Sequence, residues 1–291
     1  MKALAIDGGG IRGLIPALVL AEIERRTGRR MATMVDLIIG TSTGGIIACA
    51  LARPDPMPAE EIAAVYETDG PKIFDRSLLK RITSADGYLD ERYDSAGLVD
   101  TLRRHLGEAR LGDAVTPVLV TAYDLEERQA LLLRDPDISM VDAAHATSAA
   151  PTYFEPLRLG NRTLVDGGVF ATNPALFAFT EARMRPELLL SLGTGSLTRR
   201  LPYDKVKNWG RLEWAEPIID VVFDGSADAV DLQLQALTGD RYVRLQTRLD
   251  EASDDLDDAS AANLAALRRE AERLIAARDA EIERVCALLT S

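Results

Sequence analysis

The stretch "IIGTSTGGIIA" (38–48) places a serine between two glycines, directly after one apolar run and directly before another. The run "VDLIIG" (35–40) is predicted to be a buried strand, and "GIIACALAR" (45–53) is predicted to be a helix. Between them, "GTSTG" fits the pattern G-x-S-x-G, in which a serine occupies a sharp strand-to-helix turn and the small residues around it relieve crowding. The stretch therefore predicts either a nucleophile at Ser42 or a tight turn without a catalytic role, and its context favours the nucleophile.

The alternation of strand and helix patterns extends along much of the chain. "KALAI" (2–6) is a predicted strand that ends in a glycine cluster, and residues 13–28 have the apolar period of a helix. Further predicted strands, at 116–124, 162–168 and 187–195, also end in turn residues. Nearly continuous apolar strands alternating with helices predict a three-layer α/β/α fold with a mostly parallel central sheet. In such a sheet the ligand crevice lies at the carboxyl ends of the strands, where this sequence has its polar and glycine clusters.

Residues 1–291 are predicted to form a single domain whose motifs lie within the first 200 residues. Segment 259–289 carries an apolar stripe at helical spacing and is predicted to be one long helix that docks by that stripe. Segment 70–112 is less regular, apart from a predicted helix at "AGLVDTLRRHLG" (96–107), and we interpret it as an insertion or a lid over the sheet edge.

Composition excludes several classes of partner. A formal net charge of -12 argues against a protein that binds nucleic-acid polymers, and it weakens the idea of broad electrostatic docking to anionic lipid. The apolar run at the N-terminus is too short for a signal peptide, and no stretch has the length of a membrane span. We therefore expect a soluble, cytoplasmic protein that contacts a membrane only transiently. Cys49 and Cys286 are expected to be buried and reduced.

The glycine loop "DGGGIRG" (7–13) allows three interpretations. It matches the dinucleotide fingerprint G-x-G-x-x-G between a predicted strand and helix. That fingerprint needs an acid at the end of the second strand, whereas here Asp36 stands at the beginning of that strand. Alternatively, consecutive glycines let backbone N–H groups converge as an oxyanion hole, with a helix N-terminus behind them. The third interpretation is a tight turn that only packs the helix.

A base for Ser42 is harder to assign, because no histidine follows residue 145 and the usual order Ser, Asp, His cannot be completed. His105 ends a polar helix, and His145 lies in a small-residue stretch where a structural role is expected. Asp166 ends an apolar strand in "LVDGGV", and burial would raise its pKa toward that of a useful base. Asp7 is its rival, and the chemistry of the residues favours Asp166 only modestly, with Asp7 as an anchor of the glycine loop.

Taken in order, "DGGGIRG", "GTSTGG", "ATSAAPTYF" (146–154), "DGG" (166–168), "TNPA" (172–175) and "SLGTG" (191–195) resemble the patatin-like phospholipase family. The resemblance implies a lipid acyl hydrolase with a serine–aspartate dyad, in which Ser42 is the nucleophile and Asp166 the base. It also implies an oxyanion hole formed by the amides of Gly9, Gly10 and Thr43, with Arg12 as nearby positive charge. The motif glycines are Gly8, Gly13, Gly40, Gly44, Gly167 and Gly168. His145 departs from the pattern, since many relatives have an arginine there.

The implied reaction cleaves carboxylic esters of phospholipids or lysophospholipids through an acyl-Ser42 intermediate. No cofactor or metal is expected, and the acidic run 250–258 lacks the glycine and terminal glutamate of an EF-hand loop. Segment 70–112 is our candidate for the lid and acyl pocket. Two alternatives stay open, a nucleotide-activated phospholipase effector that degrades membranes and a dinucleotide-binding oxidoreductase. Self-association into a homo-oligomer is also left open.

Overall fold

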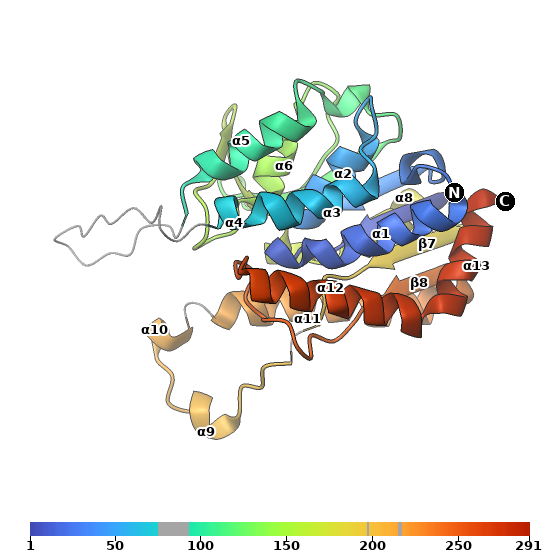
Figure 1. The fold of residues 1–291 in the computed structure, drawn as a ribbon. Helices are drawn as coiled ribbons and strands as arrows, with labels where there is room; N and C mark the ends of the chain where they lie inside the picture. The colour runs from blue at the N-terminus through green and yellow to red at the C-terminus, as the bar shows by residue number, and fades with distance from the viewer. Residues whose placement is uncertain (75–92, 197, 215–216) are drawn as a thin grey trace.

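The structure, a computed structural model, describes residues 1–74, 93–196, 198–214 and 217–291 (Figure 1). Eight strands of the described part form one sheet in the order β5-β6-β3-β2-β1-β7-β8, with β4 also paired to β3. Their bounds are β1 Lys2–Ile6, β2 Leu37–Gly40, β3 Val118–Asp124, β4 Gln129–Leu133, β5 Leu157–Leu159, β6 Arg162–Asp166, β7 Leu188–Leu192 and β8 Tyr242–Leu245.

The sheet is parallel over five strands and antiparallel at one edge. Strand β1 pairs in parallel with β2 and β7, and the parallel run continues to β3 on one side and β8 on the other. Strands β4 and β6 pair antiparallel with β3, and β5 pairs antiparallel with β6. The prediction of a mostly parallel sheet is therefore confirmed, with an antiparallel extension that the sequence pattern did not indicate.

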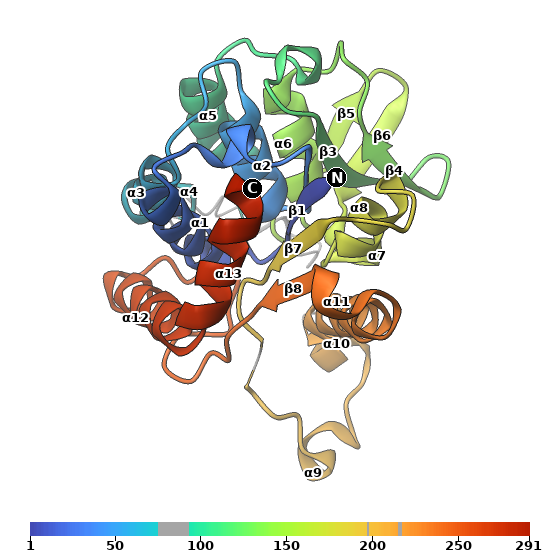
Figure 2. The ribbon, with the colours of Figure 1, turned by 90° about the vertical axis from the view of Figure 1, so that its right-hand side faces the viewer.

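Helices cover both faces of this sheet. The helices of the described part are α1 Leu14–Thr27, α2 Thr43–Ala52, α3 Ala59–Thr68, α4 Gly70–Ile73, α5 Ser95–Leu106, α6 Met140–Ser148, α7 Gly168–Ala171, α8 Ala175–Glu181, α9 Tyr203–Val206, α10 Arg211–Trp214, α11 Pro217–Thr238, α12 Ala261–Ala277 and α13 Asp279–Thr290. Helices α1, α2, α3, α6 and α12 lie on one side, and α7, α8 and α11 lie on the other, as Figure 2 shows. This arrangement confirms the three-layer α/β/α prediction.

Alternation along the central strands supplies an apolar surface to each layer. Leu4 and Ile6 of β1 belong to the larger core, beneath α1 and α2, while Ala3 and Ala5 belong to the smaller core beneath α8. Successive side chains of a strand point to opposite faces, so a continuous apolar run is the pattern expected of a strand covered on both sides. Cys49 and Cys286 are buried and unpaired, as expected for small apolar side chains.

The prediction for the C-terminus was wrong in one respect. Segment 259–289 forms two helices, α12 and α13, separated at Arg278, whose backbone is non-helical at φ −111° and ψ 23°. A straight helix over that segment would be about 46 Å long, more than twice the length of α1. The break allows both α12 and α13 to contact the shorter helix α1. At the break, Arg26 of α1 forms an ion pair with Asp279, the first residue of α13.

The structure also contains strands and helices that the sequence pattern did not predict. Strands β4, β5 and β8 and helices α3 and α11 were not predicted, whereas the helix at 96–107 is confirmed as α5. Of the irregular segment 70–112, residues 75–92 lie outside the described residues, so the prediction of a lid stays a prediction there. The single-domain prediction also stays a prediction. Among the helices that the structure describes, none is both long enough and apolar enough to span a membrane.

Candidate active site

Ser42 occupies a strained turn between β2 and α2. Its backbone has φ 53° and ψ −125°, a conformation that side-chain-bearing residues rarely adopt. The turn is also crowded, because a Cβ added to Gly40 would lie 2.1 Å from the Gly44 carbonyl oxygen and one added to Gly44 would lie 2.2 Å from that of Ile6. Only glycine fits at these two positions, so the geometry is that of a nucleophile elbow rather than of a relaxed turn.

Hydrogen bonds from three distant segments hold this elbow. The Ser42 amide donates to Thr147 Oγ1 of α6 at 2.8 Å. The neighbouring Thr41 hydroxyl donates to the Ala171 carbonyl oxygen at 2.7 Å and accepts from Thr121 Oγ1 at 2.8 Å. These buried bonds fix the position of the Ser42 backbone relative to α6, α7 and β3.

Asp166 reaches the same edge of the sheet from an antiparallel strand. On β3, Val120 pairs with Gly40 of β2 on one side, and Ala122 pairs with Asp166 of β6 on the other. The end of β6 and the end of β2 are therefore only two residues apart along β3. Ser42 and Asp166 line one cavity, together with Gly9, Gly10 and Thr43.

The Asp166 carboxyl group is fully buried, and only one of its two oxygens accepts a hydrogen bond from a described residue. Oδ1 accepts a hydrogen bond from the Gly168 amide at 2.7 Å, and Oδ2 has no hydrogen-bond partner among the described residues. Burial raises the pKa of Asp166 to about 7, against the opposing effects of the Ser42 side chain and the Gly168 N–H. A carboxylate with a pKa near neutrality is a far better proton acceptor than an exposed one.

The glycine loop presents unbonded amides to the cavity. Gly8 and Ile11 donate their amides to the carbonyl oxygens of Thr172 and Leu256, which fixes both ends of the loop. Between them, the amides of Gly9 and Gly10 form no hydrogen bond with another described residue. Gly10 has φ +57°, the left-handed region that favours glycine. The loop therefore offers two N–H donors to a group bound beside Ser42.

Two further groups lie close to these donors. The amide of Thr43, the first of helix α2, also has no acceptor among the described residues. Arg12 is buried and donates from Nε to the Gly9 carbonyl oxygen at 3.3 Å, and its Nη1 has no partner in the described part of the chain. Arg12 is not a cavity-lining residue, so its charge acts on the loop from behind. Gly13 packs against Thr43, since a Cβ there would lie 2.3 Å from Thr43 Oγ1.

Two of the other titratable candidates, Asp7 and His145, do not share the cavity with Ser42, whereas His105 does. Asp7 is bound by the guanidinium of Arg244 through two hydrogen bonds and does not line the cavity. His145 lies on α6 outside the cavity lining, and burial lowers the pKa of its imidazole. His105 lies in the last turn of α5, where its Nε2 is 3.1 Å from Asp69 Oδ2, and it reaches the cavity wall.

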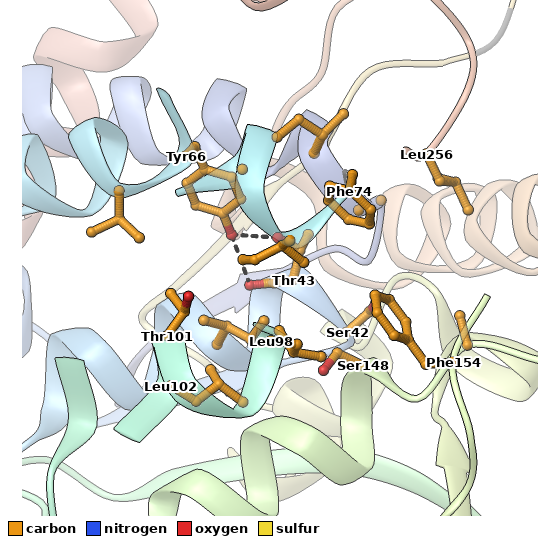
Figure 3. Close-up of a pocket in the computed structure, with 18 of the residues that line it drawn as sticks. Ser42, Thr43, Tyr66, Phe74, Leu98, Thr101, Leu102, Ser148, Phe154 and Leu256 are labelled. Atoms are coloured by element: carbon orange, nitrogen blue, oxygen red, sulfur yellow. Dashed lines mark hydrogen bonds between the residues drawn. The ribbon is translucent and has the colours of Figure 1, made fainter. Parts of the chain in front are cut away.

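The cavity is apolar and runs along one side of α2. Ser42, Thr43, Ile46 and Ala50 line it at helical spacing, so it extends about 12 Å from the serine. Figure 3 shows side chains of α3 and α5 facing this side of α2, and the aromatic rings of Phe74 and Phe154 near the serine. The volume is about 100 Å³. Such a narrow apolar channel beginning at a serine suits a linear hydrocarbon chain.

Three polar residues of this site carried little or no signal in the sequence. Tyr66 of α3 forms a short hydrogen bond with Thr43 Oγ1, drawn as a dashed line in Figure 3, and no motif surrounds it. Thr147 and Thr194 lie inside "ATSAAPTYF" and "SLGTG", so their motifs were visible although their roles were not. Thr194 Oγ1 donates to the Gly8 carbonyl oxygen at 2.7 Å and closes the glycine loop from the far side.

In the described part of the chain, no group of three or more His, Cys, Asp or Glu side chains is arranged to hold a metal ion. The site is thus a serine and a buried carboxyl group at an apolar channel, with free amides beside them. A serine at a strand-to-helix turn of a three-layer α/β/α fold, next to an apolar channel, is typical of the class of α/β enzymes that hydrolyse esters.

Comparison with known proteins gives the family. The model of the patatin-like phospholipase family matches residues 4–179. The chain is 31% identical to "Probable inactive patatin-3-Kuras 1" of Solanum tuberosum, covering 94% of this chain and 86% of that protein. It is 33% identical to "cGAMP-activated phospholipase" of Pseudomonas aeruginosa, covering 84% of this chain and 78% of that protein. This chain belongs to the patatin-like phospholipase family, and its membership supports a lipid hydrolase activity.

Among solved structures, VipD from Legionella pneumophila matches with a TM-score of 0.45 and 12% identity, over 95% of this chain and 67% of that one.

Proposed function

We propose that this protein is a lipid acyl hydrolase that cleaves carboxylic esters of phospholipids or lysophospholipids. The observation that carries the proposal is the placement of Ser42, in a strained elbow, beside a buried Asp166 whose pKa is raised to about 7 by burial. Membership of the patatin-like phospholipase family supports the same substrate class.

In the first half of the reaction, Asp166 accepts the Ser42 proton while Oγ attacks the ester carbonyl carbon. The free amides of Gly9, Gly10 and Thr43 donate hydrogen bonds to the oxyanion that forms, and each such donor is worth about 3–4 kcal/mol of transition-state stabilisation. Arg12, buried behind the loop, adds positive potential. Collapse of the tetrahedral intermediate breaks the ester bond, Asp166 returns the proton to the leaving oxygen, and an acyl-serine remains.

In the second half, Asp166 activates a water molecule that attacks the acyl-serine carbonyl carbon. The same amides stabilise the second oxyanion, Ser42 regains its proton and the fatty acid leaves. One carboxyl group serves both halves, because it ends each half in the protonation state that the next half requires. The acyl chain lies in the apolar channel along α2, and the alcohol or lysolipid leaves on the open side of the serine.

The decisive test is hydrolysis of a short p-nitrophenyl ester and a long-chain phosphatidylcholine by wild type, Ser42→Ala and Asp166→Asn. The dyad requires that wild type cleaves both substrates and that each variant, folded by circular dichroism, loses at least about a thousand-fold in kcat/KM. Activity retained in Asp166→Asn would refute Asp166 as the base.

Whether an activator is needed is a separate question, raised by the similarity to a cGAMP-activated phospholipase. Hydrolysis with and without added cGAMP answers it, and full basal activity removes a nucleotide switch. The oxidoreductase alternative lacks the acid that its fingerprint requires at the end of β2, where the serine turn follows Gly40. Absence of a thermal shift with NAD or NADP would complete that exclusion.

A further inference from the structure

The segment that connects β7 to α11 has a charge opposite to that of the protein. Residues 198–214, which we name the arm, connect β7 to α11 and stand away from the body in Figures 1 and 2, where they carry α9 and α10. Between Arg199 and Trp214 the sequence has five basic and two acidic side chains, in a chain whose net charge is -12. The arm is therefore a local positive region on an acidic protein.

Three of these five cations form no ion pair within the part of the chain that the structure describes. Arg199 pairs with Asp220, Asp254 and Asp255 at the base of the arm, and Lys207 pairs with Asp204 within it. Arg200, Lys205 and Arg211 form no ion pair with another described residue, and all three are exposed. Arg199 thus only partly offsets the charge of three carboxylates at the base of the arm, whereas Arg200, Lys205 and Arg211 face solvent.

The arm also holds an unusual share of the aromatic residues. Both tryptophans of the chain lie here, and the rings of Trp209 and Trp214 pack edge to face with their centroids 5.1 Å apart. Neither ring is buried, and Tyr203 is 76% exposed. Tryptophan and tyrosine beside lysine and arginine are typical of segments at the boundary between lipid headgroups and acyl chains.

The apolar character continues onto the helix that follows. Ile218, Val221 and Val222 of α11 are 43%, 44% and 43% exposed. Their spacing of three and four residues places them on one face of the first turns of the helix. An uncovered aliphatic face next to exposed aromatic rings and free cations is a larger apolar surface than single exposed residues would form.

This surface is connected directly to the candidate active site. Phe223, the next residue of α11, is buried and lines the cavity, and it contacts Gly168, whose amide binds Asp166. Farther along α11, Ser226 Oγ accepts from the Thr172 amide and donates to its hydroxyl. One face of α11 therefore packs on the site while the adjacent face stays open.

We propose that the arm, together with Ile218, Val221 and Val222, is the surface by which this protein binds an anionic lipid bilayer. The idea that this contact delivers lipid substrate to Ser42 rests on the proposed function, whereas the binding of the bilayer does not. Arg200, Lys205 and Arg211 attract the headgroups, and Trp209, Trp214 and the aliphatic face enter the interface. The net charge of -12 of the whole chain opposes approach by other faces, so binding favours the orientation in which the arm meets the lipid.

The tryptophans make this contact directly measurable. In a Ser42→Ala background, which prevents hydrolysis of the vesicles, titration with phosphatidylcholine vesicles containing phosphatidylglycerol should shift the tryptophan emission to shorter wavelength. Pure phosphatidylcholine vesicles, or added salt, should weaken binding about ten-fold or more. Co-sedimentation of the protein with the vesicles without an emission shift would mean that another surface binds, which would overturn the proposal. Absence of binding to anionic vesicles would overturn it as well.

Matched variants locate the surface. Lys205→Glu/Arg211→Glu should lower vesicle binding at least about ten-fold, since each basic side chain near an anionic surface contributes several-fold. The control Arg29→Glu/Arg185→Glu makes the same charge change at exposed positions that precede β2 and β7, at the end of the sheet where the parallel strands begin, and should retain binding.

The apolar part of the surface is tested by a second pair of variants. Val221→Ser/Val222→Ser should weaken binding, whereas Leu232→Ser/Leu237→Ser, at exposed leucines in the second half of α11, should not. Equal losses in test and control variants would overturn the assignment.

Hydrolysis separates this proposal from the proposed function. With Ser42 intact, Lys205→Glu/Arg211→Glu should keep its rate on a soluble short-chain ester and lose at least ten-fold on anionic vesicles. If neither wild type nor the variant cleaves any ester, the proposed function fails. The emission shift still tests whether the arm binds the bilayer. If vesicle hydrolysis is unchanged in this variant, or if the emission shift follows protein concentration without lipid, the bilayer proposal fails.

Discussion

Arg244 of β8 binds the carboxylate of Asp7, at the end of β1, with one nitrogen on each oxygen, and Nη1 lies 2.9 Å from Oδ1. Nη1 also donates to Ser191 Oγ of β7 at 2.8 Å. The pair joins three neighbouring strands below the glycine loop, and both side chains are almost fully buried. Asp7 is therefore committed to an ion pair and is not available to accept the Ser42 proton.

Replacing Arg244 by Met should destabilise the protein strongly, because Asp7 would stay buried without its counter-charge. A loss of about 3–5 kcal/mol in the free energy of unfolding is expected from urea denaturation. Arg248→Met is the control, since Arg248 is exposed and its pair with Asp250 spans 3.9 Å. That change should cost at most about 1 kcal/mol. Equal losses would contradict a buried role for the Asp7–Arg244 pair.

The raised pKa of Asp166 predicts the pH dependence of hydrolysis. The base is functional only when deprotonated, so kcat/KM on a soluble ester should rise with pH up to about 7 and level off above it. Below that value it should fall about ten-fold per pH unit. A stopped assay from pH 5 to pH 9 measures the profile. A plateau that extends down to pH 5 would contradict a raised pKa for the group that accepts the proton.

The same raised pKa predicts that the stability of the folded protein falls with rising pH, whereas its activity rises. Because the folded-state pKa of Asp166 lies above the reference value of 3.8, the folded protein holds a proton that the unfolded chain has lost between about pH 4 and pH 7. Stability should therefore fall as pH rises through this window. Asp166→Asn has no such proton, so its stability relative to wild type should increase by about 3 kcal/mol from pH 5 to pH 8. Denaturation of both proteins at the two pH values tests this, and an unchanged difference would contradict it.

The channel along α2 predicts a chain-length effect. Ala50 lies eight residues beyond Ser42, about 12 Å along the helix, and Leu at this position would fill the channel there. Ala50→Leu should lower kcat/KM for long-chain esters about ten-fold or more and leave that for a butyrate ester unchanged. Ala64→Leu, at an exposed position of α3, is the size-matched control. Equal effects on both chain lengths would place the acyl chain elsewhere.

The parallel core of the fold could be predicted because each of its strands is a short apolar run ending in turn residues. Strands β1, β2, β3 and β7 all fell within predicted segments. Strand β8 was missed because "YVRL" is short and carries a charged residue, although Gly239 and Asp240 mark a turn before it, and Arg244 looks like an ordinary surface residue. The partner of Arg244 lies 237 residues away, so no local pattern could show that Asp7 was already paired.

For the site, the elbow was predictable because Gly40 and Gly44 are required by local crowding. The strand that ends at Asp166 was predicted, but its direction in the sheet was not. Strand β6 is antiparallel to β3, and its register with β3 brings Asp166 near the end of β2. Register between strands depends on packing across the whole sheet, which is why the choice between Asp166 and Asp7 stayed open on the residues alone.

The backbone conformation of Ser42 has a consequence for the stability of this protein. A serine at φ 53° and ψ −125° raises the free energy of the folded state by about 1–3 kcal/mol relative to a glycine there. Replacement of Ser42 by Gly should therefore relieve the strain and stabilise the fold, while it removes the proposed nucleophile. The side chain on which the proposed function depends is thus one without which the folded chain would be more stable.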